Sequence, residues 1–262
     1  MPTLLSVTII TLNAAATLRQ CLESVAWADE IIVVDSGSTD ATRSIAEKSG
    51  ARIIHNDWPG YGAQKNFAVA QASHNWVLSL DADEWLSAEL THSIRALMKG
   101  IPPQHAYACK RCNRFMGRWL RHGEGYPDTI LRLFDRRHAA WSTDVIHEHV
   151  VCATPVGSPI GILSGDLMHE SEAGLAAYLA KQNRYTSLQA AVLHQRGKRA
   201  NLLQLLFSPP LRFIKFYFIR LGFMDGVPGL VHIAIGCFNS FTKYAKLREI
   251  ECAAQQQGTG YR

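Results

Sequence analysis

Short apolar runs alternate with amphipathic segments along the first hundred residues of the chain. The runs at residues 5–10, 30–34, 51–54 and 76–80 are rich in Val, Ile and Leu, as strands buried on both faces of a sheet are. The segments between them carry turn-forming residues and then apolar residues at helical spacing. This alternation predicts an α/β fold with a mostly parallel sheet flanked by helices.

The second half of the chain has a different pattern. Residues 107–151 are rich in basic and aromatic residues, and residues 175–195 have the apolar spacing of a helix. Two prolines at 209 and 210 then separate an apolar run at 202–207 from a helix predicted at 211–221. That last helix places Arg212, Lys215 and Arg220 on one side and apolar side chains on the other, which makes it amphipathic.

These patterns predict a domain over residues 1–195, with halves at 1–100 and 101–195, and a C-terminal helical extension over 196–262. Charge also differs between the two ends of the chain. Residues 1–100 hold 7 Lys and Arg against 11 Asp and Glu, a net charge of −4, whereas the remaining residues hold 20 against 11, a net charge of +9. The excess of positive charge predicts an anionic partner for the second part of the chain: phosphate, lipid or nucleic acid.

Acidic residues follow two of the predicted strands. Asp35 comes after residues 30–34, and Asp81 and Asp83 come after residues 76–80. Ligands of parallel sheets lie beyond the carboxyl ends of the strands, so these side chains are expected on the binding rim. Asp81 and Asp83 can point to one side of an extended chain, where their repulsion calls for a cation such as Mg²⁺ or Mn²⁺. The alternative is a solvated turn that begins the next helix.

Several common nucleotide and metal motifs are absent from the sequence. No glycine-rich dinucleotide fingerprint follows the first strand, and there is no P-loop. Cys109 and Cys112 have the spacing of a metal or redox pair, but no second pair matches them, and we interpret them as ordinary thiols. The amino terminus has no basic, leader-like segment, so we expect reduced cysteines and a cytoplasmic protein.

Four motifs, in order and at matching spacing, resemble the inverting family 2 glycosyltransferases with the GT-A fold. They are Thr8–Asn13, Val33–Asp40, Gln64-Lys65-Asn66 and Asp81-Ala82-Asp83-Glu84. Later segments resemble the lipopolysaccharide core glucosyltransferase branch, so that the resemblance covers nearly the whole chain. These segments are Arg132-Leu133-Phe134, His147-Glu148, His169-Glu170-Ser171, Lys181–Tyr185 and Gly222–Gly226.

The resemblance implies a UDP-sugar donor and a divalent ion, Mg²⁺ or Mn²⁺. Asp83, with Asp81 beside it, would hold the ion on the diphosphate, and His169 would complete the metal site or else be a core histidine. Asp35 would accept hydrogen bonds from uracil or ribose. The donor-binding residues implied in this way are Thr11, Asn13, Asp35, Ser38, Asp40, Lys65 and Asp81, with Lys181 and Tyr185 as a lid over the diphosphate.

The basic and aromatic segment at 107–151 suits a phosphorylated glycolipid acceptor, and the resemblance implies that this acceptor is of the lipid A–core type. Arginine binds phosphate through two N–H groups, and aromatic faces suit sugar rings, so Arg114, Trp119 and Arg132 are the predicted acceptor contacts. The alternatives are an ordinary surface ribbon or a single-stranded nucleic-acid surface. We expect no nucleic acid, since no nucleic-acid-binding motif accompanies the segment.

An inverting transfer is a single displacement and needs a base for the acceptor hydroxyl. We predict Glu148 as this base, on an apolar strand predicted over residues 145–151, and Asp128 as the alternative. Glu124 lies between two glycines and is a poorer candidate, because a base must be held in position.

The helix predicted at 211–221 is typical of helices that lie in the interface of an anionic leaflet, although it could instead pack on the catalytic domain. Neither it nor residues 227–241 reaches the roughly 20 apolar residues of a membrane span. We therefore expect a protein peripheral to the cytoplasmic face of the inner membrane.

The resemblance, together with these features, implies an inverting, metal-dependent hexosyltransferase that moves glucose from UDP-glucose onto an inner-core heptose of lipopolysaccharide. Another bacterial surface glycan or lipid-linked sugar is the alternative acceptor. A nucleotidyltransferase or a non-catalytic membrane or nucleic-acid binding module are alternatives of other classes. The first would need a glycine- and lysine-rich loop after the first strand, and the second would not need paired acids at two strand ends.

Overall fold

A computed structural model describes residues 2–142, 144, 148–153, 159–170 and 174–259 of the 262-residue chain. The chain divides into two compact units. The first contains Met1–Cys112 and Asp128–Ser171, and the second contains Asn113–Pro127 and Glu172–Arg262. The second unit therefore takes the 175–195 helix and residues 113–127, so the predicted boundary after residue 195 lies inside it.

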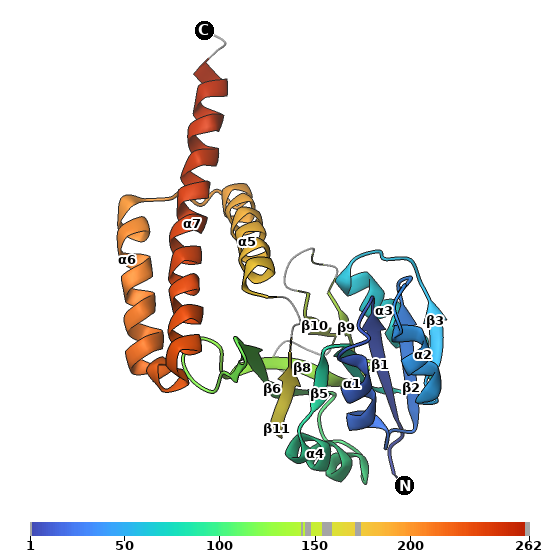
Figure 1. The fold of residues 1–262 in the computed structure, drawn as a ribbon. Coiled ribbons are helices and arrows are strands. Elements are labelled where there is room, and N and C mark those ends of the chain that lie inside the picture. The colour runs from blue at the N-terminus through green and yellow to red at the C-terminus, as the bar shows by residue number, and fades with distance from the viewer. Residues whose placement is uncertain (1, 143, 145–147, 154–158, 171–173, 260–262) are drawn as a thin grey trace. The chain divides into compact units, whose positions relative to one another are not determined.

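A nine-stranded sheet forms the centre of the fold, in the order β3-β2-β1-β4-β8-β6-β11-β5, with β7 paired to β6 (Figure 1). Strands β9 and β10 form a separate antiparallel pair. The strand bounds are β1 Leu5–Thr11, β2 Glu30–Asp35, β3 Arg52–His55, β4 Trp76–Asp81, β5 Glu84–Leu86, β6 Ala106–Phe115, β7 Arg118–Trp119, β8 Asp128–Asp135, β9 Ala139–Trp141, β10 Val150–Cys152 and β11 Gly161–His169.

The α/β class is confirmed, and the parallel part of the sheet consists of β1 to β4. Strand β8 pairs antiparallel with β4, β6 pairs antiparallel with β8, and β11 pairs antiparallel with β5. The reason lies in the connections, because helices link the first four strands, whereas β6 and β8 are joined without a crossover helix. The register places Thr11 opposite Asp35 and Ile10 opposite Asp81, so both acids lie on the rim at the carboxyl end of β1.

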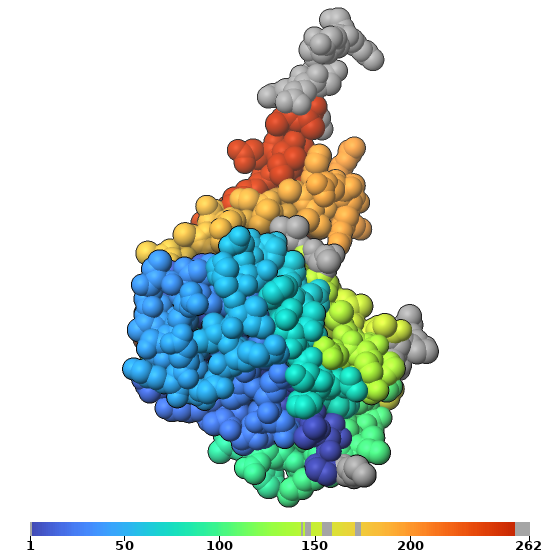
Figure 2. All heavy atoms as spheres, turned by 90° about the vertical axis from the view of Figure 1, so that its right-hand side faces the viewer, coloured from blue at the N-terminus to red at the C-terminus, as the bar shows by residue number. Residues whose placement is uncertain are grey.

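Two apolar layers cover the parallel strands. Helices α1 (Leu18–Val25), α2 (Thr42–Lys48) and α4 (Ala88–Met98) contribute to one cluster of buried residues, and α3 (Tyr61–Ala70) contributes to the other. Strand β1 is buried over its full length because both faces are covered. In Figure 2 the residues of this part, from blue to cyan, form one closely packed surface.

The second unit is built on three long helices, of which α5 and α6 both pack on α7 (Figure 1). Helix α6 runs through Pro209 and Pro210 and continues directly into the π-helical turn η1, so the predicted break at these prolines was wrong. The bounds are α5 Leu175–Gln195, α6 Leu202–Phe213, η1 Ile214–Ile219, η2 Gly222–Asp225 and α7 Gly226–Thr259. Of the described helices, the stretch Leu202–Ile219 is long and apolar enough to cross a membrane by length and composition, and none of it is buried.

Residues 113–127 are fixed to these helices by charged contacts. The guanidinium of Arg212 pairs with the carboxylate of Glu124, and Asp225 accepts hydrogen bonds from the backbone N–H groups of Arg121 and His122. A Cβ atom at Gly236 would meet the carboxylate of Glu124, so glycine at this position leaves room for the carboxylate where it now lies. These contacts explain why this segment belongs to the second unit.

Candidate active site

The carboxylate of Asp35, the last residue of β2, is buried and organises the turn that follows it. One oxygen accepts hydrogen bonds from the N–H groups of Gly37, at 3.1 Å, and Ser38, at 3.0 Å, and the hydroxyl of Ser38 donates to the other. Gly37 has a φ of 97°, which glycine adopts without strain. Asp35 is therefore a turn-forming residue here, and its hydrogen bond to uracil or ribose stays a prediction.

Asn13 and Asp40 tie this turn to the loop after β1. The N–H of Asn13 donates to the hydroxyl of Ser38, and its side-chain oxygen accepts from the N–H of Thr39, both at 2.8 Å. Asp40 accepts from the N–H of Ala15 at 3.1 Å. The structure thus brings together five of the predicted donor-binding residues, namely Thr11, Asn13, Asp35, Ser38 and Asp40, on two neighbouring loops.

The variant Asp35→Ala is expected to weaken binding of UDP in the absence of metal by at least about tenfold. It removes a charged acceptor and also releases the turn at Gly37 and Ser38, and hydrogen bonds to charged groups contribute about 1.5–3 kcal/mol each. Calorimetric titration with UDP and a chelator measures the effect. The exposed carboxylate Glu47, changed to Ala, is the control. Unchanged UDP binding by Asp35→Ala would leave Asp35 a structural residue only.

The motif Gln64-Lys65-Asn66 in α3 sends three successive side chains to three places. Gln64 donates to the hydroxyl of Ser36 and so supports the loop after β2. Asn66 bonds to both the N–H and the carbonyl of Trp141. Lys65 points towards the acidic residues at the rim of the sheet. The three side chains of the motif therefore hold neighbouring parts of the site in place.

Lys65 is 2% exposed, and its ammonium lies 3.1 Å from both Asp81 and Glu148. It also lies 4.4 Å from the ring centroid of Trp141, close enough for a cation–π contact. Two carboxylates therefore pair with its charge in this structure. The predicted contact of Lys65 with the nucleotide or phosphate stays a prediction.

Ion pairs of alternating sign continue from Asp81 to the other end of the site. Arg132 lies 3.3 Å from Asp81 and 2.7 Å from Glu84, a carboxylate that is fully buried. Arg111 in turn lies 3.5 Å from Glu84 and 2.7 Å from Asp128. We call the whole series the charge chain: Glu148, Lys65, Asp81, Arg132, Glu84, Arg111 and Asp128.

The charge chain sets the protonation of its central members. Burial alone would raise the pKa of Asp81, but the charges of Lys65 and Arg132 outweigh it and lower that pKa to about 2. Burial would lower the pKa of Arg132, and the carboxylates of Glu84 and Asp81 instead raise it above its usual range. Arg132 was a predicted acceptor contact; it lies buried between two carboxylates, and its contact with the acceptor stays a prediction.

Asp83 and His169, two of the three predicted metal ligands, lie beside each other. The Nε2 atom of His169 lies 3.3 Å from a carboxylate oxygen of Asp83, and both side chains are partly exposed. Strand pairing explains the contact, since His169, at the end of β11, is opposite Glu84 in β5. One carboxylate and one imidazole fit a divalent ion that takes its other ligands from phosphate and water, while Asp81 is held by Lys65 and Arg132.

The two candidate bases are the two ends of the charge chain. Glu148 lies just before β10 rather than within a strand, so the predicted strand over 145–151 is wrong at this residue, and 145–147 lie outside the described residues. Asp128 begins β8, and Nε and Nη2 of Arg111 both donate to one of its oxygens. Both carboxylates are thus held by a cation in a defined position.

A second cluster with metal-ligand chemistry lies at the opposite end of the strands. Ligand atoms of His105, Asp135 and His138 come within 4.8 Å of one another. Asp135 pairs with Trp76 at the start of β4, whereas Asp81 ends that strand, so the cluster is remote from the rim. The carboxylate of Asp135 also accepts hydrogen bonds from the guanidinium of Arg137, which competes with any cation.

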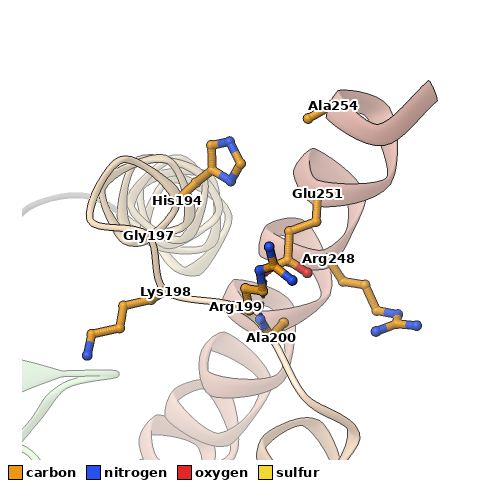
Figure 3. A pocket seen from close by; sticks show the side chains of 8 residues that line it. All are labelled: His194, Gly197, Lys198, Arg199, Ala200, Arg248, Glu251 and Ala254. Atoms are coloured by element: carbon orange, nitrogen blue, oxygen red, sulfur yellow. Dashed lines mark hydrogen bonds between the residues drawn. The ribbon is translucent and has the colours of Figure 1, made fainter. Parts of the chain in front are cut away.

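A pocket of about 540 Å³ opens in the second unit, between the end of α5 and α7. It is basic, but Figure 3 shows Lys198 and Arg248 pointing away from each other, so they do not converge on one ligand. The lining residues are His194, Gly197, Lys198, Arg199, Ala200, Arg248, Glu251 and Ala254.

Comparison with known proteins identifies the family. The family model described as glycosyl transferase family 2 matches residues 6–154, more than half of the chain. The chain belongs to glycosyl transferase family 2. It is 34% identical over 94% of its length to an uncharacterised glycosyltransferase of Rickettsia typhi, of which it covers 87%. It is 31% identical over 93% of its length to the lipopolysaccharide core biosynthesis glycosyltransferase LpsC of Rhizobium meliloti, of which it covers 91%.

A solved structure of glucosyl-3-phosphoglycerate synthase from Mycobacterium tuberculosis, in complex with Mn²⁺ and UDP, is 26% identical in sequence. The match covers 43% of this chain and 44% of that one, with a TM-score of 0.36. Such a score is too low to support an inference about this glycosyltransferase, and its assignment rests on the family match and the relatives above. The resemblance expected from the four sequence motifs is confirmed.

Four predicted site residues of the glycosyltransferase lie in its second unit. Lys181 and Tyr185 are neighbours on α5, with the ammonium 5.8 Å from the ring centroid. Arg114 and Trp119 are paired across β6 and β7, with the guanidinium 5.7 Å from the indole ring. Their contacts with diphosphate and acceptor stay predictions.

Three residues of the site were not identified from sequence, namely Glu84, Arg111 and Trp141. Glu84 belongs to the motif Asp81-Ala82-Asp83-Glu84. Three acids so close together were a signal that one carboxylate would turn inward and pair with a cation. Arg111 was counted among the basic residues of the 107–151 segment. Trp141 lies between Lys65 and Arg132, 4.4 Å and 5.2 Å from their charged groups, and no local pattern marks that position.

Proposed function

We propose that this glycosyltransferase is an inverting, metal-dependent hexosyltransferase that moves glucose from UDP-glucose onto an inner-core heptose of lipopolysaccharide. The observation that carries the proposal is the position of Asp83 and His169 at the carboxyl end of the sheet, next to two loops that carry the other predicted donor contacts. The similarity to LpsC over nearly the whole of both chains supports the acceptor class. Another lipid-linked surface glycan is the alternative acceptor.

The chain's own residues would divide the work as follows. Asp83 and His169 would hold Mg²⁺ or Mn²⁺, and the ion would neutralise the charge that develops on the leaving diphosphate. The loops joined by Asn13 and Asp40 would hold the nucleoside. Asp81 would orient the end of β4 beside the ion. Because Lys65 and Arg132 already pair with its carboxylate, Asp81 would give only part of its charge to the ion.

A thermal-shift panel of UDP-, ADP- and GDP-sugars with Mg²⁺ or Mn²⁺ tests the donor. A ligand that binds only the folded protein raises its stability by RT ln(1 + [L]/Kd), so the true donor should give the largest shift. A response to UDP-glucose that depends on metal supports the proposal. A larger shift with an ADP- or GDP-sugar would overturn the donor assignment.

The variant Asp83→Asn is expected to abolish the metal-dependent part of UDP-glucose binding while the protein stays folded. Asp83 is 33% exposed, and its partner His169 is held by strand pairing, so the loss of one charge leaves the apo fold intact. Calorimetric titration with and without Mn²⁺ measures this, with Glu47→Gln as the matched control. Metal-dependent binding that equals the wild type would remove Asp83 from the metal site.

A further inference from the structure

Exposed large apolar side chains are concentrated in one part of the second unit. More than half of those in the described chain lie between residues 202 and 241, on α6, η1, η2 and α7. The stretch Leu202–Ile219 contains no acidic residue, and none of its residues is fully buried. A helix that faces water normally carries charged and polar side chains on its outer side, so this surface calls for an apolar partner.

Exposure along α6 and η1 follows the helical period. One side, which includes Leu205, Phe213 and Phe216, is half-buried, and α6 packs on α7. The opposite side is also apolar, and each of its large side chains is at least 48% exposed. We call it the outer stripe, and it consists of Leu203, Leu206, Phe207, Leu211, Ile214 and Phe218.

Two basic residues of this segment form contacts within the second unit. Arg212 pairs with Glu124, and Arg220 donates to the carbonyl of Tyr126 at 3.1 Å. The sequence pattern predicted that both, with Lys215, face an anionic leaflet. In this structure the charged groups of Arg212 and Arg220 are engaged by residues 113–127.

We propose that the outer stripe inserts into the hydrocarbon boundary of one lipid leaflet and that apolar contact, rather than charge, holds this glycosyltransferase at a membrane. A surface that binds a partner protein normally has a polar rim and groups that form hydrogen bonds. The outer stripe instead presents Leu, Ile and Phe over about four helical turns, with the exposed Lys215 in the same segment, as interfacial helices do. The helix lies in the interface rather than spanning it, because Arg212 in its middle is paired to Glu124.

Flotation of the full chain with phosphatidylcholine vesicles tests the proposal. The wild type is expected to float with these neutral vesicles at low and at high salt. The variant Leu203→Gln/Leu206→Gln/Leu211→Gln is expected to lose at least about tenfold in partitioning, because three large apolar groups leave the interface. Its unfolding temperature should be unchanged, since all three side chains face solvent.

The matched control is Leu4→Gln/Ile101→Gln/Ile162→Gln, which changes three exposed apolar residues of the first unit and should float like the wild type. Binding only to anionic vesicles, lost at high salt, would overturn the proposal in favour of an electrostatic contact. Dimers of the wild type in light scattering that become monomers in the outer-stripe variant, with flotation unchanged, would assign the stripe to a second copy of the chain. Donor binding reports separately on the proposed function.

Discussion

The variant Glu148→Gln is expected to lower kcat by roughly 10²–10⁴-fold, with little change in the affinity for the donor. The substitution keeps the shape of the side chain and removes its capacity to take the proton of the acceptor hydroxyl. The structure supports Glu148 because Lys65 lies 3.1 Å from both it and Asp81, which places it one side chain from the acidic strand end. Steady-state kinetics with saturating donor measures kcat.

Asp128→Asn is the matched control for this variant. Each residue is a carboxylate at one end of the charge chain, and each is paired to one cation, Lys65 or Arg111. If kcat falls only because the charge chain is broken, both variants should show the fall, together with a lower unfolding temperature. Turnover near the wild-type value for Glu148→Gln, with collapse for Asp128→Asn, would transfer the role of base to Asp128.

The variant Arg132→Met is expected to destabilise the fold by about 3–5 kcal/mol at neutral pH. Arg132 is 5% exposed and lies between Glu84, which is fully buried, and Asp81. Removing one partner of a buried ion pair leaves its charge uncompensated, which is the costly way to break such a pair. Urea unfolding of the variant and the wild type gives the difference in the free energy of unfolding.

Arg137→Met is the control for this second variant. Its guanidinium also pairs with a buried carboxylate, that of Asp135, but the Arg137 side chain is 59% exposed, so water can replace it. A change within about 1 kcal/mol is expected. If both variants lose equally little stability, the charge chain contributes no more than a surface ion pair.

The stability of Arg132→Met should depend on pH because the variant leaves the carboxylates of Asp81 and Glu84 without this cation. For the wild type, a pKa of Asp81 near 2, below its ordinary 3.8, contributes about 2 kcal/mol of stability that is present above pH 4 and is lost as the pH falls towards 2. The variant's deficit should be largest at neutral pH and should shrink as acid neutralises the uncompensated carboxylates. A deficit that stays constant from pH 7 down to pH 2 would point to lost packing instead.

Elements whose contacts lie close in the sequence were predicted well. The first four strands and their helices follow from local apolar runs and turn residues, and Asp35 and Asp81 lie where a parallel sheet requires them. Boundaries that depend on distant partners were predicted less well. Helix α6 continues through Pro209 and Pro210 because α7 packs along it, and Glu148 lies outside a strand although apolar residues surround it in the sequence.

The sequence by itself determined the family, the α/β class and the acids at the strand ends, since each depends on residue type and spacing along one segment. Only the tertiary structure decided which charged groups turn inward. Lys65 meets Glu148, 83 positions away, and Arg132 meets Glu84, 48 positions away, and no local pattern distinguishes such a buried cation from one that binds substrate. The same holds for Arg212, which charge alone assigns to a membrane and which packing pairs with Glu124. Burial makes the difference, because a charge taken out of water must have its partner within contact distance, and that partner is chosen by the fold.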